Sequence, residues 1–143
     1  MAANTIPIYS DAGQIEWSTL LQTANTAKDG TGLVQTIFTA GADGGRVERV
    51  RSKAAGTNVA TVLRVFINNG SDNSVAANNV LYAEMTIAAT TLSEVATLLT
   101  NELPNTTDTT AFPIVLPAGY KINVTIGTTV AAGLLISAVG SSY

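Results

Sequence analysis

Residues 112–127 read FPIVLPAGYKINVTIG, and this stretch decides the fold class. An apolar run ends in a Pro-Ala-Gly turn, after which apolar side chains alternate with Lys121, Asn123 and Thr125. An alternation with a period of two residues is typical of a β-strand that buries one face. The stretch therefore predicts two strands joined by a turn, an arrangement expected in a β-sandwich.

The rest of the chain repeats this pattern, because strand-like segments recur roughly every 10 to 20 residues between clusters of Gly, Asn, Asp and Pro. We predict eight strands, at residues 14–23, 33–39, 46–53, 60–68, 80–88, 112–116, 120–126 and 134–139. The strand at 60–68 is the most apolar and is expected at the centre of a sheet. Pro113 cannot donate a ladder hydrogen bond, so the strand that contains it should lie at an edge or begin after the proline. Eight short strands in one domain predict an all-β, antiparallel, jelly-roll-like β-sandwich.

Two segments lack a clear strand pattern. In residues 90–101, Thr91 and Glu94 have the spacing of a capping box, and apolar side chains form a helical stripe. We expect at most one short helical turn there. Residues 1–13 show no regular pattern and are expected to form an extended N-terminal arm, which leaves the sandwich domain at residues 14–143.

The composition removes several kinds of chemistry. The chain has no cysteine and no histidine, so disulfides, thiolate metal sites and Ser-His-Asp or Cys-His catalytic sets are excluded. Ser-Lys pairs and carboxylate dyads stay open, although no spacing favours them. The loop NNGSDN at residues 68–73 offers oxygen ligands for Ca²⁺, but it lacks the acidic spacing of an EF-hand, and turn chemistry explains it better. We therefore expect no catalytic residue, no cofactor and no metal site.

Charge and hydropathy limit the partners. A net charge of -3, with 12% charged residues, gives no field suited to nucleic acid. No stretch approaches the roughly 20 apolar residues of a membrane helix, and the N-terminus shows no secretory signal pattern. We expect a soluble protein without a nucleic-acid or membrane partner, whose apolar, threonine-rich surface binds a partner or a second copy.

The one local concentration of charge is RVERVRSK at residues 46–53, which holds four of the seven basic residues. On a regular strand, side chains alternate between two faces. One face would carry Val47, Arg49, Arg51 and Lys53, and the other would carry Arg46, Glu48 and Val50. Two interpretations stay open: a solvated edge strand that resists aggregation through its charge, and a docking stripe for an acidic protein surface.

Four segments together carry a resemblance to a known group of proteins: NTAKDGTG, GTNVATVLRVFINNGS, NNVLYAEMTIAATTLSE and LPAGYKINVTIGTTVAAG. Their succession resembles small β-rich virion proteins of tailed bacteriophages and prophages, and it is most similar to head decoration, or cement, proteins. The resemblance runs over residues 23–133 and leaves out the N-terminal arm and the NTTDTT insertion.

The resemblance implies a jelly-roll-like sandwich that binds the outside of an icosahedral capsid and has no catalytic residues. It implies a homo-oligomer, with a trimer favoured over a dimer, and the major capsid protein as partner. The protein is then made in the host cytoplasm and resides on the capsid exterior of the virion. Two sets of residues are the candidate capsid or subunit contacts: Ile6, Ile8 and Tyr9 of the arm, and Arg49, Arg51 and Lys53 of the charged strand.

A second function class stays open, a carbohydrate- or receptor-binding β-sandwich module of a tail fibre or a secreted protein. Such sites usually need exposed aromatic rings that stack on sugars. Trp17 shares a predicted strand face with Ile15 and Leu21, which favours a place for its indole in the core. A hydrolase with a carboxylate pair is a third possibility that no motif favours.

Overall fold

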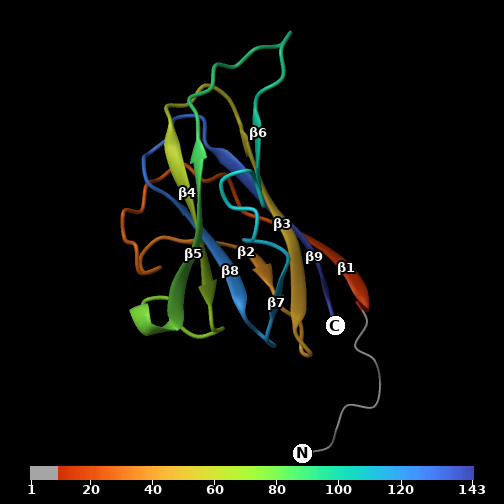
Figure 1. Ribbon diagram of the computed structural model, residues 1–143. Coiled ribbons are helices and arrows are strands. Elements are labelled where there is room, and N and C mark those ends of the chain that lie inside the picture. Colours follow the sequence, from red (N-terminus) through yellow and green to blue (C-terminus); the bar gives the residue numbers. More distant parts are fainter. Residues whose placement is uncertain (1–9) are drawn as a thin grey trace, which may run out of the picture.

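The computed structural model describes residues 10–143, which form two antiparallel β-sheets packed face to face (Figure 1). The predicted arm contacts Ile6, Ile8 and Tyr9 lie outside the described residues. The one helical element of residues 10–143 is the 3₁₀ turn η1, Ala76–Asn78. No helix in this range is long and apolar enough to cross a membrane.

Nine strands follow one another along the described chain: β1 Ala12–Trp17, β2 Gln35–Thr39, β3 Gly45–Ala54, β4 Thr61–Asn68, β5 Asn79–Ile87, β6 Thr100–Leu103, β7 Ile114–Leu116, β8 Lys121–Ile126 and β9 Leu134–Ser142. One sheet has the order β1-β9-β3-β6, with β7 also paired to β3. The other sheet has the order β2-β8-β4-β5. This is the strand order of a jelly roll in which β6 and β7 share one position. The predicted fold class is confirmed.

The strands with the clearest alternation form the centre of the four-stranded sheet. Ile122, Val124 and Ile126 of β8 are fully buried, and β8 lies between β2 and β4. Burying a side chain of this size contributes about 1.5–3 kcal/mol, so this strand anchors the core. The outer side of β8 is also covered, because Asn123 and Thr125 are buried, and Arg64 of β4 donates a hydrogen bond to the carbonyl of Asn25 in the connection between β1 and β2 (3.3 Å).

The charged strand β3 lies inside the five-stranded sheet, with β9 on one side and β6 and β7 on the other. Its interpretation as an edge strand is therefore wrong. The register against β9 shifts between Val47 and Arg49, so Glu48 is an inserted bulge residue. As a result Val47 and Val50 both point into the core, and the two-face assignment made from regular alternation is wrong. The outer face instead carries all the charged side chains of β3: Arg46, Glu48, Arg49, Arg51 and Lys53.

The prediction that Trp17 belongs to the core is also wrong, because its side chain is 72% exposed and that of Ile15 is 62% exposed. β1 ends at Trp17, and Leu21 reaches the core through a separate bridge to Leu134. The side of β1 that faces the second sheet carries Gln14, whose amide donates to the carbonyl of Thr39 at 3.2 Å. β1 begins at Ala12, inside the segment assigned to the arm.

The connection between β5 and β6 contains no helical turn, which agrees with the expectation of at most one, and it projects beyond the sandwich at the top of Figure 1. The Ser93 hydroxyl accepts hydrogen bonds from the N–H groups of Val95 and Ala96, which makes a local turn. The apolar side chains of the expected stripe are exposed, with Val95 at 97%. In contrast, β7 begins after Pro113 and pairs only with β3, which confirms the interpretation of that proline.

Candidate docking face

The outer face of the five-stranded sheet gathers exposed apolar and basic side chains, and we call it the docking face. Its apolar part consists of the exposed Ile15 and Trp17 on β1 and Leu135 on β9, together with the half-buried Val139 on β9; its basic part consists of Arg49, Arg51 and Lys53 on β3. The strand register places these residues in rows that cross the sheet. Trp17 is opposite Ser137, which is opposite Arg51, and Ile15 is opposite Val139, which is opposite Arg49. Each row therefore runs from an apolar edge to a basic centre.

The basic part of the face is only partly neutralised within the chain. Glu102 on β6 accepts from Arg51 Nε at 3.2 Å and lies 3.5 Å from Arg49 Nη1. Within residues 10–143 Lys53 forms no ion pair. These exposed pairs contribute less than about 1 kcal/mol each, so the arginines can exchange Glu102 for a partner's carboxylate at little cost.

A shallow hollow of about 250 Å³ lies where the two parts meet. Trp17 and Leu135 form its apolar wall, and Arg51 and Lys53 form its basic rim. An exposed indole stacks on flat apolar groups, and arginine and lysine bind carboxylates or other anions. The hollow can therefore hold a group that has one flat apolar side and a negative charge.

The predicted basic contacts Arg49, Arg51 and Lys53 do lie together on one exposed face, but without Val47. The neighbouring apolar residue Trp17 was missed as a surface residue. No signal in β1 could have found it, because the alternation in AGQIEW sets Ile15 and Trp17 apart from Gln14 and Glu16 and favours the apolar pair for the core.

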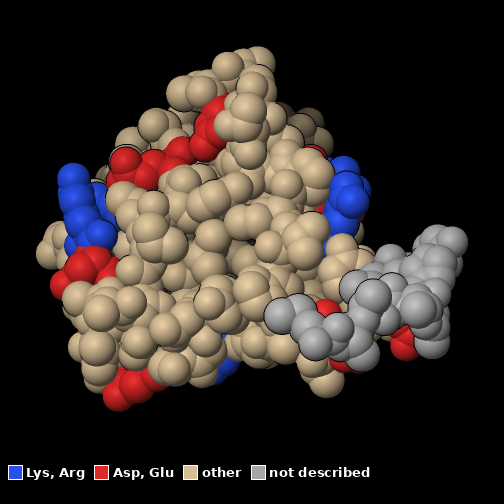
Figure 2. Space-filling view, turned by 60° about the horizontal axis from the view of Figure 1, so that its bottom comes forward, with Lys and Arg blue, Asp and Glu red and all other residues tan. Residues whose placement is uncertain are grey.

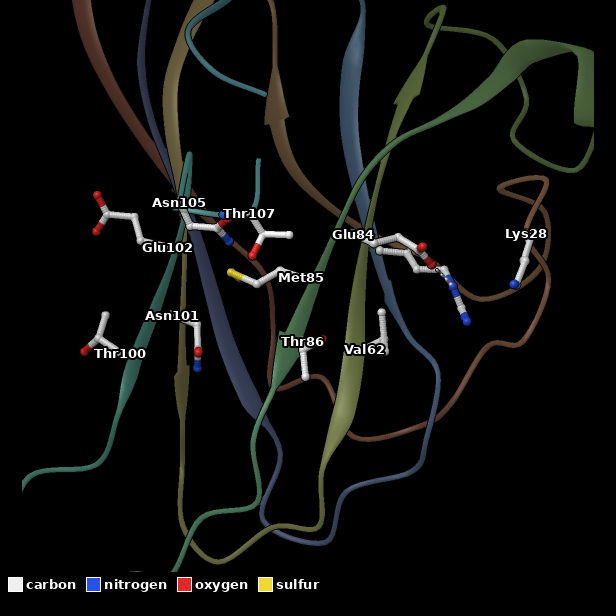
Figure 3. A pocket seen from close by; sticks show the side chains of 11 residues that line it. Lys28, Val62, Glu84, Met85, Thr86, Thr100, Asn101, Glu102, Asn105 and Thr107 are labelled. Atoms are coloured by element: carbon white, nitrogen blue, oxygen red, sulfur yellow. Dashed lines mark hydrogen bonds and ion pairs between the residues drawn. The ribbon is translucent and has the colours of Figure 1, made fainter. Parts of the chain in front are cut away.

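A second hollow, of about 560 Å³, opens between the edge strands β5 and β6 of the two sheets (Figure 3). Met85 forms its apolar floor and extends toward Asn105 and Thr107. Its remaining lining is mostly hydroxyl, amide and charged: Lys28, Arg64, Glu84, Thr86, Thr100, Asn101 and Glu102.

The carboxylates of this hollow are held by arginines. Glu84 accepts from Arg64 Nε at 3.0 Å, and Glu102 is held by the arginines of β3. The hollow therefore offers hydrogen-bonding groups rather than a free acid and base. Among residues 10–143 no group of three acidic side chains is placed to hold a metal ion.

Tyr82 on β5 contacts the segment that precedes β7. Its hydroxyl donates to the carbonyl of Ala111, and its ring meets Phe112 edge-on with centroids 5.7 Å apart. Burial raises the pKa of the Tyr82 hydroxyl, with a smaller contribution from the charge of Asp108. The neutral phenol thus holds the segment before β7 against β5.

The end of the sandwich formed by the connections β2–β3, β4–β5 and β7–β8 has a different surface. Figure 2 shows this end, where Lys, Arg, Asp and Glu side chains lie mainly around the margin and the middle carries few of them. Charged contacts are therefore expected from the sides of the sandwich, above all from the docking face.

Comparison of the chain with protein-family models, with curated protein sequences and with solved structures found no match.

Proposed function

We propose that this chain is a structural virion protein, a capsid decoration or cement protein that binds the outer surface of a bacteriophage head and stabilises it. The resemblance over residues 23–133 supports the choice of partner, the major capsid protein. The observation that carries the proposed binding mode is the docking face, on which Trp17 is 72% exposed beside Arg51 and Lys53. In this proposal the chain carries out no catalytic step and uses no cofactor, nucleic acid or membrane.

In this binding mode the apolar and basic parts of the docking face have different roles. Trp17 and Leu135 lose their water at the centre of the contact, where aromatic anchors contribute most. Arg49, Arg51 and Lys53 meet acidic side chains of the capsid, which aids encounter and fixes orientation. Ligands that bind the assembled shell but not its separated subunits stabilise the shell by mass action.

The docking face is tested by cosedimentation with empty heads of the phage. An Arg51→Glu/Lys53→Glu double variant should bind at least about tenfold more weakly, which corresponds to about 1.4 kcal/mol. Lys28→Glu makes one such lysine-to-glutamate change at an exposed site away from this face and should bind like the parent chain. Equal binding by the parent chain and the double variant rules out the docking face as the contact.

The proposed arm contact is tested separately. The arm enters the fold at β1, the strand that carries Trp17. A chain that lacks residues 1–9 keeps every described strand and should fold, and we expect it to lose capsid binding because Ile6, Ile8 and Tyr9 are gone. Undiminished binding removes the arm from the proposal and leaves the docking face in place.

A second candidate function, the carbohydrate- or receptor-binding module, is favoured by the exposure of Trp17. An indole that stands free beside cations can stack on a sugar ring and bind an acidic substituent. A glycan array decides between the two functions. Reproducible binding that is lost in Trp17→Ala, together with no binding to heads, favours the glycan function.

A further inference from the structure

The free edge of β1 differs from the other edges in the described part of the sheets. β6 and β7 are short and border Pro104 and Pro113, while β2 and β5 are each interrupted by a bulge. These features keep edge strands from pairing with another chain. β1 reads AGQIEW, contains no proline and no basic residue, and pairs with β9 without a register shift from Ala12 to Trp17.

The hydrogen-bonding groups of this edge point outward in a regular row. The N–H of Ser18 donates to the carbonyl of Ile136 at 2.9 Å, which marks these two residues as a hydrogen-bonded pair. Hydrogen-bonded pairs alternate along antiparallel strands, so the backbone N–H and C=O groups of Gln14 and Glu16 also point toward β9. The N–H and C=O groups of Gly13, Ile15 and Trp17 therefore face away from the sheet and are able to pair with another strand.

The side chains of β1 complement a second, antiparallel copy of β1. With Ile15 opposite Ile15 of the second copy, Gly13 is opposite Trp17 and Gln14 is opposite Glu16. This register pairs an amide with a carboxylate on one face and joins apolar groups on the other. If the two-fold axis moves by one residue, it passes through Glu16 or Gln14 instead. Glu16 is then opposite Glu16 of the second copy, or Gln14 is opposite Gln14, and in either register the amide–carboxylate pair is lost.

Gly13 supplies a second, independent observation. A Cβ built on Gly13 meets no atom within 4 Å, and its φ is not positive. The fold of one chain therefore has no need for a glycine here, although glycine weakens a strand. A glycine opposite Trp17 of the second copy leaves room for that indole, and an aromatic ring laid over a strand glycine restores the lost packing.

We propose that two copies of this chain pair through β1, antiparallel about a two-fold axis with Ile15 at the axis, and so join their five-stranded sheets into one continuous sheet. The contact is isologous and closes at two copies. It places the two docking faces on the same side of the joined sheet, with the two Trp17–Leu135 surfaces toward the middle. The resemblance favours a trimer, whereas the chemistry of this edge fits a dimer. The dimer does not depend on the capsid being the partner.

The first test is the mass of the full chain in solution by multi-angle light scattering. We expect twice the 14.7 kDa of one chain. Ile15→Lys sets two ammonium groups opposite each other at the axis and should yield the single-chain mass with an unchanged melting temperature at low concentration. Val115→Lys on β7 is the matched control, since Val115 is 62% exposed like Ile15, and it should stay dimeric.

The second test fixes the register by cross-linking. Because the chain has no cysteine, Ile15→Cys introduces one thiol per copy. Residues in a hydrogen-bonded antiparallel pair have Cα atoms about 5.5 Å apart, which suits a disulfide. Mild oxidation should link Ile15→Cys into a covalent dimer and leave Val115→Cys unlinked. A parent chain with the mass of one or three copies overturns the proposal, as does a dimer that survives Ile15→Lys or fails to cross-link.

Discussion

Val47 and Val50 both lie fully buried between the two sheets, although they are three positions apart on one strand. Regular alternation places residues at this spacing on opposite faces. The inserted residue Glu48 resolves the conflict, because the register of β3 against β9 shifts at this point. The same shift turns Arg46 toward the face that carries Arg51, so one residue both completes the core and gathers the charge.

Deletion of Glu48 should be tolerated, because Glu48 is the extra residue of the bulge. Without it Val47 and Val50 are two positions apart, so regular alternation points both valines into the core and leaves Arg49 outside. Urea denaturation should show a loss of less than about 1 kcal/mol, since only the exposed pair with Arg46 is removed. Deletion of Arg51, in the regular part of β3, should cost more than about 3 kcal/mol, because Val50 and Ala54 are then three positions apart and one of them leaves the core. Equal effects of the two deletions contradict the role of the bulge.

Replacement of Trp17 by alanine should leave the free energy of unfolding within about 0.5 kcal/mol of the parent value at concentrations where the chain is monomeric. The reason is its 72% exposure. Phe38→Ala, at a fully buried ring, should cost about 3–5 kcal/mol in the same assay. Trp17 is the one tryptophan of the chain, so its emission reports directly on this site and should change little on unfolding. A strongly blue-shifted emission from the folded monomer would show that the indole is buried.

Asn58 should be the most sensitive polar position of the loops. Its side chain donates to the carbonyl of Gly133 at 2.8 Å and accepts from the N–H groups of Ala132 and Gly133, at 2.7 and 3.2 Å. Asn58→Ala leaves the N–H groups of Ala132 and Gly133 without a partner, while the Gly133 carbonyl keeps its hydrogen bond from the N–H of Ala55, and the change should cost about 3 kcal/mol by thermal or urea unfolding. Asn69→Ala, at an exposed turn, should cost less than about 1 kcal/mol and serves as the control.

Tyr82 should give the protein a stability that falls at alkaline pH. The pKa of its hydroxyl is raised by burial and then by Asp108, so the folded state favours the neutral phenol. The contribution of Tyr82 to the free energy of unfolding is fully present below the ordinary tyrosine pKa of about 10, and it is lost as the pH rises through the raised pKa of the folded state. Tyr82→Phe should be about 1 kcal/mol less stable at neutral pH and should lose less stability above pH 10. An identical alkaline slope in both proteins would show that Tyr82 is not the group that titrates.

The sequence identified the elements whose evidence is local. The alternation in β8 places Ile122, Val124 and Ile126 in the core, and the proline at position 113 delays β7 and keeps it at an edge. Such patterns work because neighbouring side chains on a strand must point to opposite faces, whatever the strand pairs with. The all-β class and the jelly-roll-like sandwich follow from the repetition of these patterns.

Three features could not be predicted, and all of them depend on pairing between distant parts of the chain. β6 forms because Arg51 and its neighbours on β3 offer a partner to Glu102 and its neighbours, not because TNEL has a strand pattern. The bulge at Glu48 arises from the register with β9, and the exposure of Trp17 arises because β1 turns Gln14 toward the second sheet.

By itself, the sequence determined the fold class and the residues that carry charge, since both follow from side-chain chemistry and a period of two. Only the tertiary structure decided which face of β1 and β3 is exposed. A strand with two plausible faces takes its orientation from its neighbours, because a shift of one residue exchanges the faces without changing the pattern. The meeting of Trp17 with Arg51 and Lys53 across β9 is therefore a property of the assembled sheet.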